Sequence, residues 1–446
     1  MKKYFVAFLV VYLIALLFTM NLNYVLWDEA SYLTSSLQYS GITDNYNENH
    51  FRPPLIPLLL GAIFTVSGNF VLVGKLFVIF TSIGALIFFF LITKDLFDEK
   101  TALVSSVLLG IFPLYFFYSK IIFADIPAFF FSLISIYFFL KKKPIHSGIF
   151  LSISFMAKYH IGLITGIIFV IAHLFDKTKF SGKKLNLKHI DIIKLAVVAL
   201  LVLSPWLIYN QITLGSFAAP MIDKLSIFSG EVPISAFYYF ENIFEFMPIP
   251  YIFFIFGLYF LLKNRNYKNN FLLLWFFVFF IFINLLSWKE LRFFIYTVPA
   301  MSIILAFSIF KLKERYKLLS VAVLIICIAS GLFYCFNFSQ YGYNPGYGNE
   351  RFTYETTVTV SHFVKENTNT DEIVSTNSLW PVIAYYTNRE VVVVNSFEDI
   401  GSSSYLIYYN MNLHFSDLDS LKERYELVDQ YSEHGREIYL FRIKSF

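Results

Sequence analysis

Residues 71–93 read VLVGKLFVIFTSIGALIFFFLIT and contain one charged residue, Lys75. A helix needs about 20 apolar residues to cross the hydrocarbon core of a bilayer, so this stretch predicts a membrane-spanning helix. Apolar runs of similar character recur on both sides of it. The further predicted spans are 4–22, 101–118, 122–140, 195–209, 251–262, 271–287, 293–310 and 317–337.

The composition of the whole chain supports the same class. Of its 446 residues, 57% are hydrophobic and only 15% are charged. Soluble domains carry roughly 25% charged residues, so a soluble enzyme is excluded. The two cysteines, Cys327 and Cys335, lie in one apolar run, which leaves no disulfide framework and no cysteine-based metal site. The sequence therefore predicts an α-helical polytopic membrane protein.

The distribution of Lys and Arg predicts the orientation of the chain. Twenty of these residues fall at the N-terminus and in five alternate segments between the apolar runs, against seven in the other segments up to residue 340. Basic loops stay on the cytoplasmic side of a membrane. We therefore expect a multi-pass protein of the cell (plasma) membrane, with the N-terminus inside and, after about eleven crossings, the C-terminus outside.

Two apolar stretches do not divide neatly into spans. Residues 54–93 connect an outer segment to an inner one and must cross once, so 54–69 is expected to be an interfacial or re-entrant helix on the outer face. Residues 145–175 connect two inner segments and must cross twice or form a hairpin. The apex of that hairpin would fall at Lys158-Tyr159-His160, toward the outer side.

The C-terminal part differs in kind from the rest of the chain. After a Gly/Tyr/Asn segment at 339–349, residues 350–446 contain charged residues and short alternating apolar runs. This pattern predicts a small extracytoplasmic α/β domain, separate from a membrane domain over 1–338. The expected strands are 372–376, 391–394, 405–409, 425–429 and 437–441, and the expected helices are 357–366 and 417–425.

The predicted topology brings most of the non-cytoplasmic charges to one level, at the outer ends of helices. Proton-relay carboxylates or voltage-sensing arginines would instead lie in mid-helix. This level is the candidate site. Its charged members are Asp28, Glu29, Arg52, Lys120, Asp125, Lys158, Lys289 and Arg292.

Each of these places also has a structural interpretation. Asp28-Glu29 could be a solvated helix cap, and Asp125 could simply cap the helix that follows it. Arg52 lies beside Pro53-Pro54, which suit the first turn of a helix, although an Arg there could also hold a carboxylate or a phosphate.

The cations nearer the C-terminus leave similar alternatives. Lys289 and Arg292 could extend their charges to the membrane surface from a helix end, or they could clamp a phosphate. A buried Lys158 needs an anion, whereas a single His such as His160 is more often a hydrogen-bonded packing residue.

Taken in order over residues 1–310, these motifs resemble the GT-C superfamily of polyprenyl-phosphate-sugar glycosyltransferases. The likeness is to the family-39-like group, which includes protein O-mannosyltransferases and aminoarabinose transferases. Where that group has His-Pro-Pro, this sequence has Arg52-Pro53-Pro54, with His50 two residues before Arg52. The other matching motifs are Asp28-Glu29, Leu96–Lys100, Ala124–Pro127, Ala157–Tyr159 and Lys289–Phe293 with Pro299.

The resemblance implies an enzyme that moves a sugar from a polyprenyl-phosphate donor to an acceptor hydroxyl, outside the cytoplasm and with inversion. Glycosyl transfer has oxocarbenium character, which favours a nearby carboxylate. Asp28 is the expected general base, Glu29 would orient or tune it, and Asp125 would bind the acceptor or a metal. The expected phosphate-binding residues are Arg52, Lys158, Lys289 and Arg292, and the further expected site residues are His50, Lys120 and His160.

The expected partners are the lipid bilayer, the lipid-linked donor, and a protein, lipid or glycan acceptor; no nucleic acid is expected. No cofactor is certain. Carboxylates at Asp28 and Asp125 would suit Mg²⁺ or Mn²⁺, but the sequence gives no count of ligands. The main alternative function is a transporter or lipid flippase, which would predict inverted repeats and polar residues at the midplane. A membrane receptor is a second alternative.

Overall fold

The computed structural model describes residues 1–43, 52–176, 188–223, 234–235, 237–246, 248–341, 350–410, 418–433 and 435–443. These residues form two compact units. The first lies within Met1–Thr19, His50–Leu55 and Leu76–Asn337. The second lies within Met20–Asn49, Ile56–Lys75 and Phe338–Phe446.

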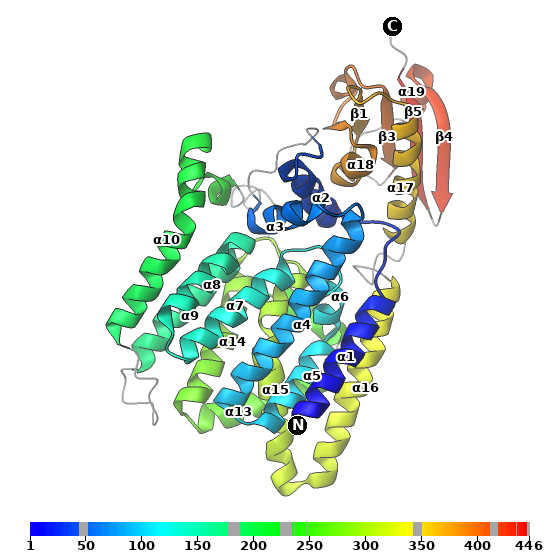
Figure 1. Ribbon diagram of the computed structural model, residues 1–446. Helices are drawn as coiled ribbons and strands as arrows, with labels where there is room; N and C mark the ends of the chain where they lie inside the picture. Colours follow the sequence, from blue (N-terminus) through cyan, green and yellow to red (C-terminus); the bar gives the residue numbers. More distant parts are fainter. Residues whose placement is uncertain are drawn as a thin grey trace. The chain divides into compact units, whose positions relative to one another are not determined.

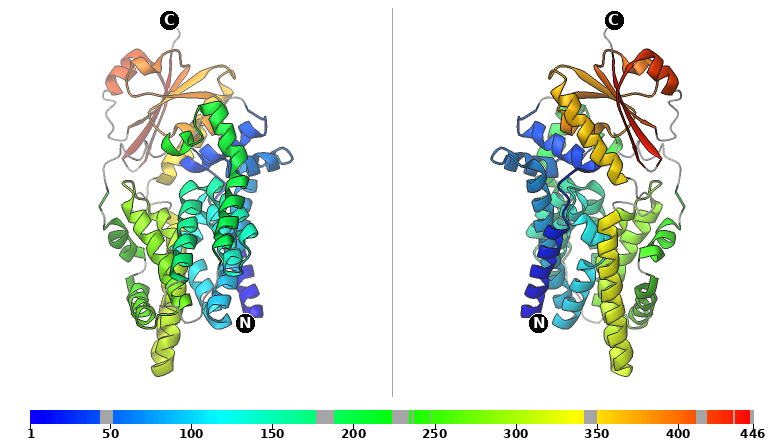
Figure 2. Two further views of the ribbon diagram at one scale, coloured as in Figure 1. Left: turned by 90° about the vertical axis from the view of Figure 1, so that its left-hand side faces the viewer. Right: turned by 90° about the vertical axis from the view of Figure 1, so that its right-hand side faces the viewer.

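The first unit is helical, and its long helices run side by side (Figures 1 and 2). Helix α8 contacts α7, α9 and α10, and α15 contacts α5 and α13. The helices are α1 (Lys2–Phe18), α4 (Phe70–Leu96, from Leu76 on), α5 (Glu99–Gly110), α6 (Pro113–Tyr118), α7 (Asp125–Leu140), α8 (Pro144–Ala157), α9 (Tyr159–Asp176), α10 (His189–Leu214), α12 (Tyr238–Phe246), α13 (Pro248–Lys263), α14 (Tyr267–Leu285), the 3₁₀ helix η1 (Leu291–Tyr296), α15 (Val298–Arg315) and α16 (Lys317–Tyr341).

The predicted class of multi-pass membrane protein is confirmed. Among the described residues, four helices are long and apolar enough to cross a membrane by length and composition: Phe70–Leu96, His189–Leu214, Tyr267–Leu285 and Lys317–Phe336. Shorter apolar helices of 10–17 residues accompany them, including Leu55–Phe64, which matches the separate helix expected over 54–69. The predicted total of about eleven crossings stays a prediction.

Several expected spans are interrupted in the structure. The stretch 101–118 divides into α5 and α6, because Phe112 is extended ahead of Pro113, which has no N–H to continue a helix. The stretch 293–310 divides into η1 and α15 ahead of Pro299. Residues 145–175 divide at Lys158, whose extended backbone separates α8 from α9. This last break falls at the predicted apex.

The second unit combines the C-terminal domain with α2 (Trp27–Tyr39) and α3 (Leu55–Phe64, from Ile56 on). The sequence did not indicate that the C-terminal domain shares a unit with segments from the N-terminal part of the chain. The predicted linker 339–349 lies mostly outside the described residues, which resume at 350.

The C-terminal domain is built on a five-stranded sheet in the order β2-β1-β3-β5-β4. Strands β2, β1 and β3 are parallel, and β5 and β4 are antiparallel additions. All five predicted strands are present. They are β1 (Ile373–Thr376), β2 (Glu390–Val393), β3 (Tyr405–Asn410), β4 (Glu426–Glu433) and β5 (Arg436–Arg442).

Helices cover both faces of this sheet. Residues of β3 alternate between the faces: Tyr405 and Tyr409 contact α17 (Glu350–Glu366), while Leu406 and Tyr408 pack in a core with Leu421 of α19 (Leu418–Arg424). Helix α18 (Trp380–Thr387), which the sequence patterns missed, contacts α17, β2 and also α2. Figure 1 shows α18 beside α2.

Candidate functional site

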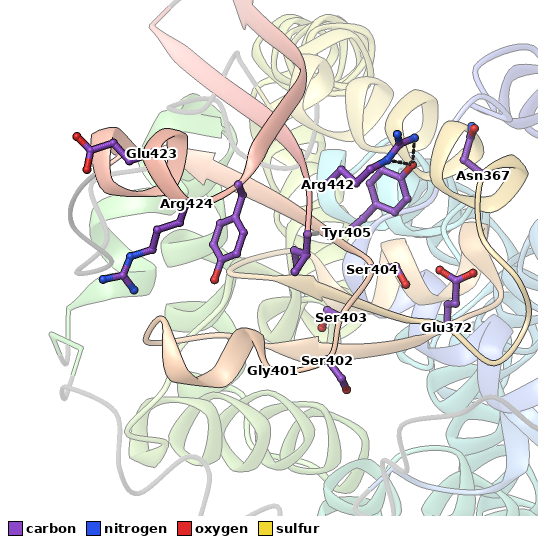
Figure 3. A pocket seen from close by; sticks show the side chains of 12 residues that line it. Asn367, Glu372, Gly401, Ser402, Ser403, Ser404, Tyr405, Glu423, Arg424 and Arg442 are labelled. Carbon is purple, nitrogen blue, oxygen red and sulfur yellow. Dashed lines mark hydrogen bonds between the residues drawn. The ribbon is translucent and has the colours of Figure 1, made fainter. Parts of the chain in front are cut away.

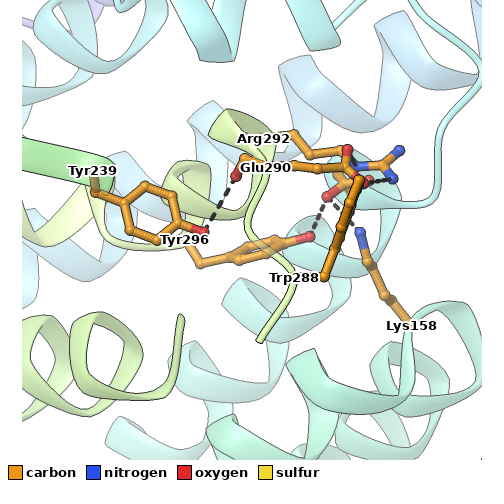
Figure 4. A network of polar contacts seen from close by, with 7 residues as sticks. Lys158, Tyr239, Trp288, Glu290, Arg292 and Tyr296 are labelled. Atoms are coloured by element: carbon orange, nitrogen blue, oxygen red, sulfur yellow. Dashed lines mark hydrogen bonds and ion pairs between the residues drawn. The ribbon is translucent and has the colours of Figure 1, made fainter. Parts of the chain in front are cut away.

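The site in the first unit is centred on Asp125, in the first turn of α7. The residue is only 1% exposed. Lys158 Nζ donates to Asp125 Oδ1 at 2.6 Å, and the Tyr296 hydroxyl donates to the same oxygen. Figure 4 shows Lys158 and Tyr296 approaching from different elements. A buried carboxylate needs such partners, because an isolated charge in an apolar interior is strongly destabilising.

The local backbone explains why these groups meet. Lys158 occupies the extended break between α8 and α9, so its side chain leaves the helical hairpin at the hairpin's apex. Tyr296 is the last residue of η1, one tight turn after Arg292. The 3₁₀ segment therefore presents a phenol and a guanidinium within one short stretch of chain.

Arg292 is held by Glu290. Its Nε lies 2.6 Å from Glu290 Oε2, and its Nη2 donates to Oε1 at 2.7 Å. Such a two-point contact fixes the plane of the guanidinium. The Glu290 carboxylate also accepts a hydrogen bond from Trp288 Nε1 at 2.9 Å, and the Glu290 backbone carbonyl accepts one from the Tyr239 hydroxyl at 3.3 Å (Figure 4).

Aromatic rings surround the cations of this group. Lys158 Nζ lies 5.2 Å from the centre of the Phe293 ring, and the Arg292 guanidinium lies 4.9 Å from that of Phe123. Lys289 Nζ donates to the backbone carbonyls of Ile234 and Leu286, at 3.0 and 2.7 Å. Lys289 is only 5% exposed, so this charge too lies inside the protein.

We call Asp125, Lys158, Lys289, Glu290 and Arg292 the charged cluster. Lys158 and Arg292 both interact electrostatically with Asp125. The cluster contains three cations and two carboxylates, and the Lys289 ammonium bonds to carbonyls rather than to a carboxylate. Among the described members of this cluster the cations therefore outnumber the carboxylates by one, an arrangement that favours an anionic ligand.

Asp28 and Glu29 lie in the second unit, in the first turn of α2, and their environments differ. Asp28 is half-buried, whereas Glu29 is 1% exposed. Glu29 Oε2 accepts the Leu26 N–H at 2.9 Å, and Oε1 lies 3.1 Å from Lys75 Nζ. The two adjacent carboxylates thus differ in burial, and only Glu29 belongs to the buried interior.

The remaining predicted site residues have other surroundings. Lys120 Nζ donates to Thr19 Oγ1 at 2.8 Å and lies over the Phe116 ring. The His160 ring stacks on Phe282 and meets Tyr296 edge-on. Arg52 is half-buried ahead of α3, and His50 lies outside the described residues.

The structure thus brings together Asp125, Lys158 and Arg292 of the predicted residues. Lys289 is buried next to Glu290 in the chain, and the site adds residues that the sequence analysis missed. Glu290 stands between two predicted cations in the sequence, so its pairing could have been suspected. Tyr296 and Tyr239 carried no signal beyond their aromatic character, and Lys75 was hidden in an apolar run. Their roles depend on contacts between distant segments.

The two buried carboxylates, Asp125 and Glu29, already face cations of the protein itself. Among the described residues, no group of three or more His, Cys, Asp and Glu side chains could hold a metal. Asp125 and Glu29 each face a lysine ammonium at 2.6 and 3.1 Å. A metal would have to replace those cations, so we derive no step through one.

The C-terminal domain has a cavity of about 900 Å³ at one edge of its sheet (Figure 3). Its polar groups largely bond to each other. Arg442 donates to the Tyr405 hydroxyl through Nε and Nη2, Glu372 accepts from Asn369, and Ser403 bonds to Ser375. These contacts hold together the ends of β1, β3 and β5.

Comparisons with known proteins agree with this architecture. Residues 51–209 match the family model of dolichyl-phosphate-mannose-protein mannosyltransferases. No curated protein matches the chain.

Solved structures match over nearly its full length. ArnT from Cupriavidus metallidurans is 11% identical in the apo state, with a TM-score of 0.70 over 98% of both chains. The structure of the same protein bound to undecaprenyl phosphate is 12% identical in sequence, with a TM-score of 0.71 over 98% of this chain and 97% of that one. The archaeal oligosaccharyltransferase AglB from Archaeoglobus fulgidus, in complex with an inhibitory peptide and a dolichol-phosphate, is 14% identical, with a TM-score of 0.64 over 98% of this chain and 74% of that one.

The shared fold, the family model and the ordered motifs support one another. The fold covers almost the whole chain, and the family model spans α3 to α10. Over nearly its full length the chain has the fold of ArnT and AglB, and residues 51–209 match the mannosyltransferase family model.

Proposed function

We propose that this chain transfers a sugar from a polyprenyl-phosphate donor to an acceptor hydroxyl on the extracytoplasmic side of the plasma membrane. The observation that carries the proposal is the excess positive charge of the buried charged cluster, because the leaving group is a phosphate. The lipids in two related structures, undecaprenyl phosphate with ArnT and a dolichol-phosphate with AglB, belong to the same chemical class.

In this proposal Asp28 is the general base. Asp28 is half-buried, whereas the neighbouring Glu29 is buried. Asp28 would remove the proton of the acceptor hydroxyl as that oxygen attacks the anomeric carbon. The bond from that carbon to the phosphate oxygen breaks on the opposite face, so the product has inverted configuration.

The cations of the charged cluster would stabilise the departing phosphate. Lys158 and Arg292 are held in place by Asp125 and Glu290, so their charges need little reorganisation during the reaction. Lys289 adds a third charge. Arg52, Lys120, His160 and His50 remain proposed site residues whose roles rest on the motif resemblance.

The experiment uses purified chain in proteoliposomes with radiolabelled polyprenyl-phosphate sugars and a membrane extract as the source of acceptors. It measures the release of free polyprenyl phosphate and the transfer of label. Asp28→Asn should lower turnover at least about 100-fold, the range expected for loss of a general base. Asp95→Asn, at an exposed ion pair with Lys141, is the matched control and should keep parental turnover.

Two results would overturn parts of the proposal. Equal turnover in Asp28→Asn and the parent would remove Asp28 from the role of base. Movement of intact lipid between leaflets, without release of polyprenyl phosphate from any donor, would favour a flippase. The identity of the labelled product would assign the acceptor to the protein, lipid or glycan class.

A further inference from the structure

Glu29 and Lys75 form a closed, buried pair beside the proposed base. Their side chains are 1% and 3% exposed, and Lys75 Nζ lies 3.1 Å from Glu29 Oε1. The other Glu29 oxygen accepts the Leu26 N–H at 2.9 Å, at the start of α2. Both carboxylate oxygens are therefore engaged, one with the first turn of α2 and one with the first turns of α4.

This pair constrains the direction of Asp28. Consecutive residues of a helix point about 100° apart around its axis, so fixing Glu29 inward directs Asp28 to a different side of the same turn. Lys75 also compensates the charge of the carboxylate adjacent to Asp28. Without Lys75, the buried Glu29 carboxylate would lose the ammonium that lies 3.1 Å from it, and the first turn would have to move to solvate the charge.

Helix α18 of the C-terminal domain packs over the same turn. The Trp380 ring meets the Trp27 ring edge-on at 6.0 Å. Tyr386 forms a hydrogen bond with the backbone of Val25. The negative charge of Glu29 interacts electrostatically with both Tyr385 and Tyr386. Burial raises the pKa of both tyrosines, and the negative charge of Glu29 raises it further, so both phenols stay protonated.

The ends of α18 show that its placement is strongly determined. Leu379, just before it, and Asn388, just after it, have left-handed backbones, with φ of 50° and 54°. A bulky residue such as Leu adopts this conformation only where surrounding contacts enforce it. Asn388 Oδ1 accepts a hydrogen bond of 2.7 Å from the hydroxyl of Thr43, which lies beyond the C-terminal end of α2. The domain thus holds the segment 25–43 at both ends.

We propose that Lys75 and α18 position Asp28, so that the C-terminal domain takes part in holding the proposed base. Lys75 acts through Glu29, and Trp380 and Tyr386 act through the first turn of α2. They are positioning residues, because none of them is required to touch the substrate. The inference rests on the proposed role of Asp28, and the experiments below separate the two.

The first experiment compares steady-state kinetics of Lys75→Met, Lys75→Arg and Asp28→Asn in proteoliposomes. Misplacing a reacting group by about 1 Å can reduce a rate about 100-fold. Lys75→Met should therefore lower kcat about 10- to 100-fold with KM for the donor changed less than about threefold. Lys75→Arg keeps the charge and should restore most of kcat. Lys141→Met removes a cation from an exposed pair and should leave kcat unchanged.

The outcomes are distinct. If Asp28→Asn is inactive while Lys75→Met keeps parental kcat, the positioning role is overturned and the proposed function stands. If Asp28→Asn is fully active, both the base and its positioning are overturned. A loss in Lys75→Met that Lys75→Arg does not restore would also contradict the charge-based role.

The second experiment tests α18 in the full chain and does not depend on turnover. Trp380→Ala should increase hydrogen–deuterium exchange of the amides in 27–39, whereas Trp380→Phe should retain near-parental exchange. Val393→Ala, at an exposed position of β2, is the control within the same domain. Parental exchange in 27–39 for Trp380→Ala would contradict a positioning role of α18. Its kcat should fall together with the loss of protection, with KM little changed.

Discussion

The two buried carboxylate–lysine pairs of this molecule have the same local design and different surroundings. Asp125 and Glu29 each lie in the first turn of a helix and each meet a lysine from a distant part of the chain, at 2.6 and 3.1 Å. Asp125 also contacts Tyr296 and interacts with Arg292, within a cluster that has an excess positive charge. Glu29 instead contacts the backbone of its own helix.

The difference indicates that a buried carboxylate–lysine pair can either help to bind an anion or fix the position of neighbouring residues. A pair with an additional cation attracts an anion, whereas a pair whose two carboxylate oxygens are both engaged fixes the position of its neighbours. Burial makes each pair consequential, because removing one partner of a buried pair costs about 3–5 kcal/mol. The predictions below test whether the surroundings decide the role.

The largest effect is expected from Lys158→Met. This change removes a cation from the charged cluster and leaves the Asp125 carboxylate without its ammonium partner. Removing one stabilising donor of a developing negative charge lowers kcat about 100- to 1,000-fold. Release of polyprenyl phosphate by reconstituted protein would measure it, with Lys141→Met as the exposed control. A KM effect alone, at unchanged kcat, would contradict a role in stabilising the leaving group.

A smaller effect is expected from Arg292→Lys. The change keeps the charge but loses the two-point contact with Glu290 and the guanidinium that lies over the Phe123 ring. A hydrogen bond to a charged group contributes about 1.5–3 kcal/mol, which corresponds to about 10- to 100-fold weaker binding of polyprenyl phosphate. Calorimetric titration in detergent measures this affinity. Arg265→Lys, at an exposed loop position, should bind like the parent.

Tyr296→Phe should have an intermediate effect that sharpens the comparison. The ring remains, but Asp125 loses its phenolic donor. We expect a fall in kcat of about tenfold, since a net hydrogen bond contributes about 1 kcal/mol and one to a charged group more. The same change at Tyr115, which bonds to Ser82 and not to a carboxylate, should leave kcat near the parental value. Equal losses in both variants would indicate general destabilisation.

Much of the fold was predictable from the sequence, because its signals are local. The apolar runs marked the helices, and the alternation in 372–441 marked all five strands. Helix α18 escaped because Trp380–Thr387 is short and apolar throughout, without the periodicity of an exposed helix. Breaks such as that at Lys158 were predictable only through the balance of charges along the chain.

The candidate site was predictable in part. The topology argument placed Asp125, Lys158, Lys289 and Arg292 at one level, and the structure brings the first two and Arg292 together. The topology argument could not show that Glu290 pairs with Arg292, because a charged residue between two cations also suits a solvated loop. Nor could it identify Lys75 as the partner of Glu29, since a pairing between separate helices leaves no trace in either segment.

The smallest effect concerns an exposed carboxylate, which tests whether burial itself matters. Glu437 faces Asn410 across β3 and β5, and hydrogen bonds from Asn410 and Tyr439 hold the pKa of Glu437 below its ordinary 4.5. The folded domain therefore binds this proton less tightly than the unfolded chain. The contribution to stability is present above pH 4.5 and is lost as the pH falls through the lowered value.

Asn410→Ala should accordingly lower the unfolding temperature of the full chain by only about 1 °C at pH 7, and the difference should disappear near pH 3. Differential scanning fluorimetry of parent and variant at both pH values measures it. Lys158→Met, measured in the same way, gives the loss for a buried pair. A fall in the unfolding temperature at pH 7 as large as that of Lys158→Met would show that pairing matters at any exposure. A small, pH-dependent loss would instead confirm that burial gives the Asp125 and Glu29 pairs their influence, because solvent weakens the same chemistry at Glu437.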